Sequence, residues 1–298
     1  VDGMIITGND GKEVANLRVE LSTRFEMKDL GELSNFLGLE VTSIMDGIFL
    51  TQERYAKKLV DRFGMKSSKK CSTPLDANAK IQSKEGSLLL DPRPFRALVG
   101  SLLYLTISRP DIVFSVNFIS RFMQAPRKPH LEVAKKILKY INTTSDMGLL
   151  YKSGADFSLH RYTDADLRGD LDDRKSTSAY VFLCGSTGVS CCSRKQDSIS
   201  LSTIDAEYKA AALAAQECVW LRRLVEDVYL PISGPTEVFG DNQSAIKLAS
   251  NPICHARTKH IELRHHFIRE KVLDGTIKVL DIRSDKNVAD ILTKALPK

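Results

Sequence analysis

The chain has 298 residues, of which 43% are hydrophobic and 27% are charged. This is the composition of an ordinary soluble globular protein with room for two domains. No run of eighteen apolar residues is present, which argues against a transmembrane helix and a membrane partner. The chain opens without a starting methionine or a signal-peptide pattern. We therefore expect a fragment of a longer product, cytoplasmic or nuclear and not secreted.

The net charge of +6 is concentrated in one half of the chain. Residues 1–152 hold 23 Lys and Arg against 17 Asp and Glu, whereas residues 153–298 hold 20 of each. A basic half can face a phosphate backbone. A solvated, slightly basic surface would give the same count, so charge alone leaves both interpretations open.

The first half predicts two small β elements and several helices. An apolar run at residues 4–10 predicts a strand, and apolar residues at helical spacing predict a helix over about 12–25. Asp46-Gly47 lies between two apolar runs, which favours a hairpin followed by a helix. Residues 66–92, rich in Lys, Ser and Pro, are typical of a mobile linker.

Three helices are expected next, at about 93–107, 111–124 and 130–143, because prolines punctuate this stretch where helices begin or end. A strand in "MGLLYKSGADFS" follows. We place the domain boundary there, giving domains 1–152 and 153–298.

The second half predicts an α/β domain. Three consecutive strands are expected in "LHRYTDAD", "STSAYVFLCG" and "VSCCSRK", followed by a long helix from about 203 to 229. A strand in "TEVFGD", helices from about 242 and 258, a strand in "TIKVLDI" and a last helix from about 287 complete the chain. Such an order predicts a mixed sheet with helices on both faces.

Four acidic residues stand where these predicted elements begin or end: Asp164, Glu207, Asp241 and Asp290. Taken singly, each has a structural explanation, since acidic residues are favoured near helix N-termini. A nearby acidic residue outside this set, Asp205, fits a capping box with Ser202 and is expected to be structural.

Taken together, the four residues favour a metal site. Converging carboxylates would repel one another by about 4 kcal/mol per pair at ~4 Å and an effective dielectric constant of about 20. Divalent cations relieve that repulsion, and an all-oxygen ligand set suits Mg²⁺. Two such ions can stabilise the attacking and leaving oxygens of a phosphoryl displacement.

The strings around these carboxylates resemble the ribonuclease H domain of copia-type retrotransposon Pol polyproteins. They occur in family order over residues 162–297: "YTDADLRGDLDDRKSTSAYVFL", "SLSTIDAEYKAA", "GDNQSAIKLASNP", "RTKHIELRHHFIRE" and "NVADILTKALP". The resemblance implies a three-layer ribonuclease H-like domain with a five-stranded mixed sheet, α+β overall when the preceding region is included.

The resemblance also implies what the site does. Asp164, Glu207, Asp241 and Asp290 match the acidic tetrad that holds two Mg²⁺ ions, with Mn²⁺ as a substitute. Asp164 would be the ligand shared by both ions, and Asp290 would help to hold the ion that activates water. Glu207 and Asp241 would support the ion at the departing 3′ oxygen. The implied substrate is the RNA strand of an RNA–DNA hybrid.

The first half resembles the reverse transcriptase of the same family, from the end of the palm through the connection. The matching strings are "MKDLGELSNFLGLEV", "FLTQERYAKKLVDRFGM", "FRALVGSLLYLTISRPDIVFSVNFISRFMQAP" and "HLEVAKKILKYINTT". The opening "VDGMIITGND" falls on the polymerase turn with the family pattern YVDD. Asp2 remains as a polymerase remnant, but Gly3 replaces the second aspartate, so polymerase activity is expected to be lost. Other parts of the Pol polyprotein are expected partners.

The stretch "CHARTKHIELRHHFIRE" holds several basic residues. Its histidine spacing matches no common zinc pattern. Helix packing and contact with a nucleic-acid backbone both remain open. If the stretch contacts nucleic acid, the candidate residues are Arg257, Lys259, His260 and Arg264.

Two functions of different classes follow from the sequence. The first is a metal-dependent ribonuclease H, favoured by the intact tetrad. The second is an inactive remnant of a retroelement that only binds nucleic acid. It is favoured by Gly3 and by the absence of two tryptophans that the family usually carries near Leu167 and Cys191.

Overall fold

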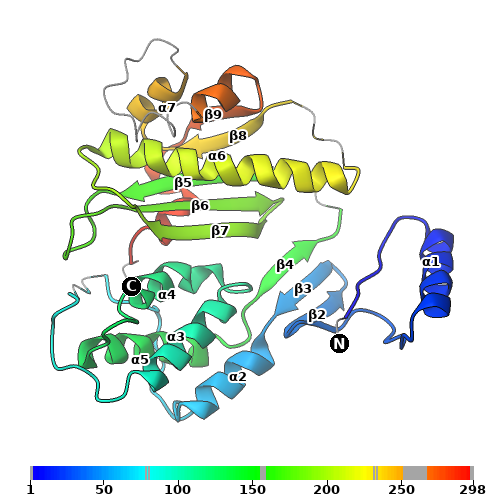
Figure 1. Ribbon diagram of the computed structural model, residues 1–298, viewed down its shortest axis with the longest axis horizontal. Coiled ribbons are helices and arrows are strands. Elements are labelled where there is room, and N and C mark those ends of the chain that lie inside the picture. The colour runs from blue at the N-terminus through cyan, green and yellow to red at the C-terminus, as the bar shows by residue number, and fades with distance from the viewer. Residues whose placement is uncertain are drawn as a thin grey trace.

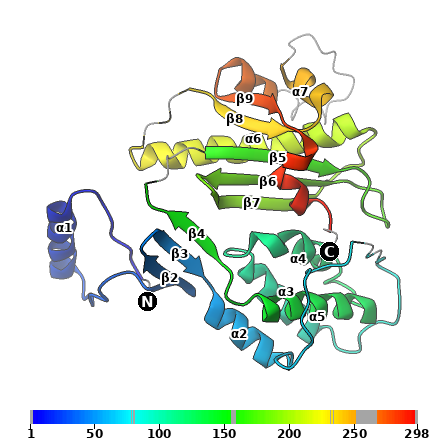
Figure 2. The ribbon, with the colours of Figure 1, turned by 180° about the vertical axis from the view of Figure 1, so that it is seen from behind.

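The computed structural model describes residues 3–77, 79, 81–154, 159–230, 232, 234–250 and 267–295. Residues up to 152 form a helical bundle with a small sheet, and residues from 159 onward form a five-stranded sheet covered by helices (Figures 1 and 2). Among the described residues, no helix is both long enough and apolar enough to cross a membrane.

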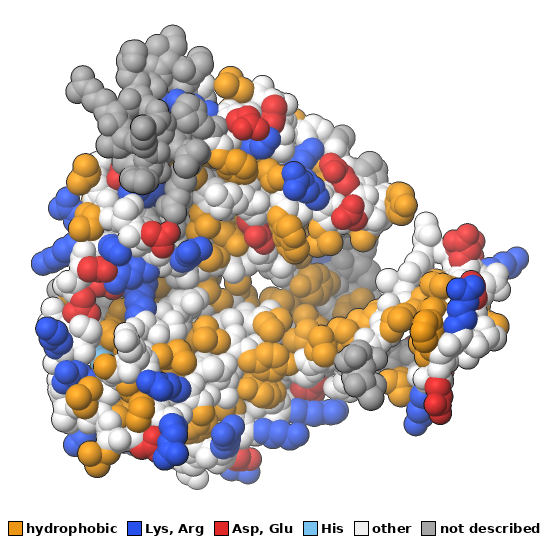
Figure 3. Space-filling model, viewed as in Figure 1, with side chains coloured by type: hydrophobic (Ala, Val, Ile, Leu, Met, Phe, Trp, Pro, Cys, Tyr) orange, Lys and Arg blue, Asp and Glu red, His pale blue; other side chains and the backbone are white. Residues whose placement is uncertain are grey.

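The N-terminal helix α1 (Gly11–Arg24) stands apart from the rest of the molecule (Figure 1). Asp10 caps it by accepting hydrogen bonds from the backbone of the first turn, but none of its residues is buried. Hydrophobic side chains are visible along this segment in Figure 3. The helix prediction is confirmed.

The strand predicted over residues 4–10 is wrong. Residues 3–8 form no regular structure, and the side chains of Met4 and Ile5 are 61% and 44% exposed. An apolar run becomes a strand only where another strand pairs with it, and no strand pairs with this run in the described part of the chain.

The small sheet is antiparallel, in the order β1-β2-β3-β4. The Asp46-Gly47 hairpin is confirmed. Gly47 has a φ of +144°, and a Cβ there would lie 2.0 Å from the carbonyl oxygen of Tyr151, so only glycine fits. The strands are β1 (Asn35–Phe36), β2 (Leu39–Ile44), β3 (Gly47–Thr51) and β4 (Leu149–Lys152).

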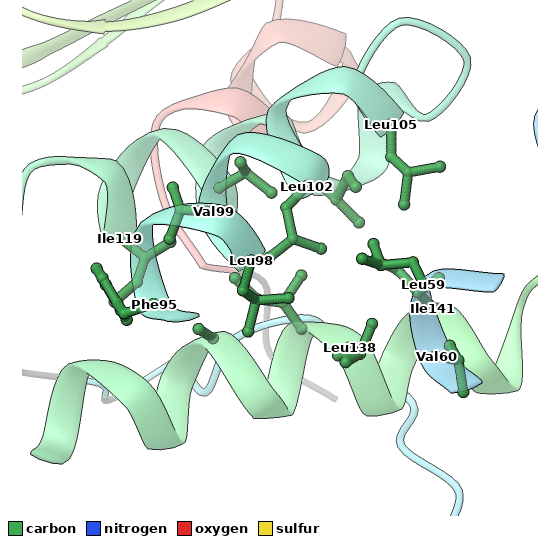
Figure 4. Packing of buried hydrophobic residues seen from close by; sticks show 14 of the residues in the cluster. Leu59, Val60, Phe95, Leu98, Val99, Leu102, Leu105, Ile119, Leu138 and Ile141 are labelled. Atoms are coloured by element: carbon green, nitrogen blue, oxygen red, sulfur yellow. The ribbon is translucent and has the colours of Figure 1, made fainter. Parts of the chain in front are cut away.

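The helical bundle confirms the predicted helices. Its elements are α2 (Glu53–Arg62), α3 (Arg93–Leu105), η1 (Pro110–Ile112), α4 (Val113–Ser120) and α5 (Lys128–Thr143). Apolar residues spaced three and four apart, such as Leu98 and Leu102 of α3, meet Leu138 and Ile141 of α5 in one buried core (Figure 4). The described residues between α2 and α3 contain only one isolated bridge, Leu88 with Arg127.

The large sheet has the order β7-β6-β5-β8-β9. β5, β6 and β7 are antiparallel, whereas β5, β8 and β9 are parallel, so the predicted mixed sheet is confirmed. Its elements are β5 (Leu159–Asp166), β6 (Thr177–Cys184), β7 (Thr187–Lys195), α6 (Thr203–Asp227), β8 (Thr236–Gly240), α7 (Gln243–Ser250), a helical segment at 267–273 and β9 (Ile277–Asp281).

Alternate residues of β6 serve two different cores. Tyr180 and Phe182 pack with α6, which crosses one face of the sheet in Figure 1 and lies behind it in Figure 2. Ala179 and Val181 face the opposite side. There they meet the short 3-10 helix η3 (Val288–Leu292) and Val113 of α4. The last helix predicted from about 287 is the short 3-10 helix η3 in the described part of the chain, not an α-helix, and α4 supplies part of the third layer.

Asp170 joins the two parts of the chain. Its Oδ2 lies 3.2 Å from Nη1 of Arg121 in the loop after α4 and 2.7 Å from Nζ of Lys195 at the end of β7. Asp170 is buried, and the Arg121 side chain is only 16% exposed. The Tyr151 hydroxyl also donates to the carbonyl oxygen of Gly188, 3.1 Å away.

We expect Asp170→Asn to lower the free energy of unfolding by about 3 kcal/mol, because it leaves the mostly buried Arg121 guanidinium without its counter-charge, whereas Lys195 keeps Asp173 at 2.9 Å. Urea denaturation measures the change. Asp285→Asn is the matched control, since Asp285 pairs with Arg283 on an exposed surface and should contribute less than about 1 kcal/mol. Equal losses of stability in both variants would show that the ion pairs of Asp170 with Arg121 and Lys195 do not hold the two parts together.

Candidate metal centre

Three carboxylates meet at one edge of the large sheet. Asp164, Glu207 and Asp241 each offer an oxygen, and these oxygens lie within 4.8 Å of one another. Asp164 and Glu207 are buried, at 6% and 7% exposure, and Asp241 is half-buried. The structure thus brings together three of the four acidic residues that the sequence singles out.

Strand register explains why two of them are neighbours. β5 and β8 are adjacent and parallel, and Arg161 and Tyr162 pair with Val238 and Phe239. Continuing that register places Asp164 beside Asp241, at the carboxyl ends of both strands. Glu207 is the fifth residue of α6, just past the first turn of the helix. Ala206 and Ala210, both buried, pack against Ala165 and set α6 close to β5.

Burial and mutual repulsion disfavour the ionised forms of two of these carboxyls. Burial, reinforced by the charges of Asp241 and Asp290, raises the pKa of Asp164 to about 6, although a hydrogen bond from Thr293 acts against the rise. Burial, followed by the charges of Asp164 and Asp241, raises the pKa of Glu207 to about 9. A divalent cation would relieve this repulsion, and the all-oxygen donor set fits Mg²⁺.

Asp290 lies beside the three-carboxylate group and is not one of its members. It is the third residue of η3, and its Oδ1 lies 2.6 Å from the ammonium of Lys294. Its charge still contributes to raising the pKa of Asp164 and Glu207, although it is not the main cause in either. Asp290 therefore belongs to the same electrostatic environment.

Asp205 has the structural role that the sequence predicts. Its backbone N–H donates to Oγ of Ser202, and its carboxylate accepts from the backbone N–H of Leu201 at 3.1 Å. The same carboxylate lies 3.1 Å from the buried ammonium of Lys209. Asp205 is therefore engaged in capping α6 and pairing with Lys209, and it is not a member of the three-carboxylate group.

Sequence reasoning missed three residues around the centre. Asn287 donates its amide to the carbonyl oxygen of Thr163, 3.0 Å away, and Thr293 donates its hydroxyl to Oδ2 of Asp164. Asp166 ends β5, and burial raises the pKa of its carboxyl. The string "NVADILTKALP" contains the first two, but nothing in its spacing shows that they reach β5.

Five predicted residues lie outside the described part of the chain. One is Asp2 of the polymerase motif. The others are the candidate nucleic-acid contacts Arg257, Lys259, His260 and Arg264.

Comparisons with known proteins show which proteins the chain is similar to. A profile of the reverse transcriptase (RNA-dependent DNA polymerase) family matches residues 1–77. The retrovirus-related Pol polyprotein from transposon RE1 of Arabidopsis thaliana is 39% identical over 99% of this chain. The chain covers 20% of that polyprotein, so it spans about a fifth of its length. A transposon Ty5-1 protein of Saccharomyces cerevisiae is 33% identical over 73% of this chain and 71% of its own length.

A solved ribonuclease H1 isolated from compost, LC11-RNase H1, is similar to 46% of this chain and 92% of its own, with 19% identity and a TM-score of 0.34. The same enzyme was also solved with an RNA/DNA hybrid. In the present chain, the five-stranded mixed sheet with α6 packed on one face has the architecture that the sequence resemblance implies. The chain belongs to the retrovirus-related Pol polyprotein family of copia-type retrotransposons, and its residues 1–77 match the reverse transcriptase family.

Proposed function

We propose that the chain is a ribonuclease H, an endoribonuclease that hydrolyses the RNA strand of RNA–DNA hybrids with the help of divalent metal. The observation that carries this proposal is the convergence of Asp164, Glu207 and Asp241 within 4.8 Å at the sheet edge. Structural carboxylates are usually paired with cations or used as caps, as Asp170 and Asp205 are. Buried carboxylates that face one another without such partners indicate a cation site.

Four residues would hold the metal in this proposal. Asp164, Glu207 and Asp241, with Asp290 beside them, would hold two Mg²⁺ ions, or Mn²⁺ as a substitute. Bound metal would supply an activated water and charge stabilisation at the scissile phosphate. The protein contributes fixed geometry, since β5, β8 and α6 hold the three carboxylates before any substrate binds.

The proposed organisation is a reverse transcriptase region at 1–152 and a ribonuclease H domain at 153–298. The +6 charge of the first region favours binding of the hybrid, because Lys and Arg neutralise phosphates. Other parts of the Pol polyprotein are the proposed protein partners, and the cytoplasm or nucleus is the proposed compartment.

The alternative is an inactive retroelement remnant that only binds nucleic acid. Gly3, at the position of a family aspartate, favours loss of function in the polymerase part. The three-carboxylate group argues against the same loss in the ribonuclease part, because the ligands that a metal would need are still brought together.

Substrate choice separates the two functions. The purified chain is incubated with Mg²⁺ and with an RNA–DNA hybrid, single-stranded RNA or duplex DNA, each labelled on one strand. We expect cleavage of the RNA strand of the hybrid alone. Binding of the hybrid without cleavage of either strand would support the remnant and reject the ribonuclease.

We also expect the chain to incorporate no nucleotides on a primed template. Polymerase chemistry depends on carboxylates that hold the catalytic metal ions, and Gly3 removes one of them. The measurement is primer extension with Mg²⁺, using hybrid cleavage by the same preparation as the control for active protein. Extension of the primer would contradict the expected loss.

A further inference from the structure

The short helix η3 is bonded to β5 at two consecutive residues. At its start, the Asn287 amide donates to the carbonyl oxygen of Thr163. At its end, the Thr293 hydroxyl lies 2.5 Å from Oδ2 of Asp164. Asn287 and Thr293 are 5% and 1% exposed, so water does not compete for either bond. The two bonds fix η3 against the strand that carries Asp164.

The acceptor of the second bond is a carboxylate of the three-carboxylate group. Asp164 pairs across the sheet with Ala179, whose side chain lies in the core shared with η3. A hydroxyl that donates to one carboxylate oxygen limits rotation of the whole carboxylate, and so directs its other oxygen. The carboxylate that Thr293 restrains is one of the three whose oxygens lie within 4.8 Å of one another, together with those of Glu207 and Asp241.

A purely structural role is the competing explanation. The same hydroxyl lies 3.0 Å from the carbonyl oxygen of Asp290, where it could cap the end of η3. A threonine hydroxyl has one hydrogen, and a charged carboxylate is the stronger acceptor. The shorter distance to Asp164 agrees with that preference.

We infer that Thr293 is a positioning residue, which holds the Asp164 carboxylate in the orientation that binds divalent metal. This inference rests on the proposed function, and it adds a residue that neither the acidic tetrad nor the spacing of the motifs identifies. Partners that orient a metal ligand typically change metal affinity by about 10- to 100-fold when they are removed.

The experiment compares three variants of the full chain in a calorimetric titration with Mn²⁺. Thr293→Val keeps the shape but removes the hydroxyl, and Thr293→Ser keeps the hydroxyl. Thr163→Val is the matched control, because the buried Thr163 hydroxyl donates to the carbonyl oxygen of Ala179 and to no carboxylate. Melting curves confirm that each variant is folded.

We expect Thr293→Val to weaken Mn²⁺ binding about tenfold or more. Thr293→Ser should stay within about threefold of the parent chain, and Thr163→Val should bind Mn²⁺ as the parent does. Parent-like binding by Thr293→Val would overturn the inference. So would a loss in Thr293→Ser or in Thr163→Val equal to that in Thr293→Val, because packing or general destabilisation would then explain the effect.

Hybrid cleavage by the same proteins separates this inference from the proposed function. A parent chain that binds Mn²⁺ but cleaves no hybrid would reject the ribonuclease, whereas the Mn²⁺ affinities would still decide the role of Thr293. A parent chain that binds no Mn²⁺ would overturn both.

Discussion

Asp241→Asn is expected to reduce hybrid cleavage by about 100-fold or more while leaving the fold intact. Asparagine keeps the shape of the side chain but removes one ligand charge from the three-carboxylate group. The charge of Asp241 helps to raise the pKa of Asp164 and of Glu207, so its removal relieves repulsion. The metal-free melting temperature should therefore be equal to or slightly above that of the parent.

Asp205→Asn is the control for this prediction, since Asp205 lies two residues before Glu207 but caps α6 and pairs with Lys209. The Lys209 side chain is only 6% exposed, so losing its counter-charge should destabilise the fold by about 3 kcal/mol, more than the loss of a simple helix cap. Cleavage below the melting temperature should stay within a few fold of the parent. Equal losses of activity in the two variants would show that the metal ligand has been assigned to the wrong residue of "STIDAEY".

Glu207→Gln is expected to raise the melting temperature of the metal-free protein by about 5 °C or more at pH 8. Burial, followed by the charges of Asp164 and Asp241, raises the pKa of Glu207 from 4.5 to about 9. The folded state therefore holds this proton more tightly than the unfolded state does. The resulting stability is complete below pH 4.5 and is lost as the pH rises towards 9.

Glutamine cannot ionise, so the variant should lose less stability over that range than the parent does. Melting curves between pH 5 and pH 9 in EDTA measure the difference. Saturating Mg²⁺ should stabilise the parent more than the variant, because a cation that binds only the folded state raises its stability. If the melting temperatures of the two proteins in EDTA changed with pH in parallel, Glu207 would not belong to a group of buried carboxylates that repel one another.

Local patterns were enough to predict most of the elements. The Asp46-Gly47 pair indicates a hairpin because only glycine tolerates the backbone that this turn needs. Apolar spacing in α3 and α5 indicates helices, since the same residues that set the period fill the core. Asp164 and Asp241 could be paired in advance because both lie at the carboxyl ends of strands of one predicted sheet.

Non-local contacts account for what the sequence could not predict. The apolar residues at 4–8 resemble a strand, but strand formation depends on a partner elsewhere in the chain. The residues after 287 resemble a helix, but the Asn287 and Thr293 bonds to β5 define a short 3-10 turn. Val113 of α4 packs against Ala179 and Val181 of β6, about 70 positions later in the sequence. The spacing of apolar residues within either segment does not reveal such a contact.

Cleavage of the RNA strand of a labelled hybrid by the parent chain, in Mg²⁺ and then in excess EDTA, tests the central claim most directly. We predict cleavage in Mg²⁺, its complete loss in EDTA, and its recovery when Mg²⁺ or Mn²⁺ is added back. Folded parent protein that binds the hybrid yet leaves the RNA strand intact in Mg²⁺ and in Mn²⁺ would contradict the claim that Asp164, Glu207 and Asp241 form the metal centre of a ribonuclease H.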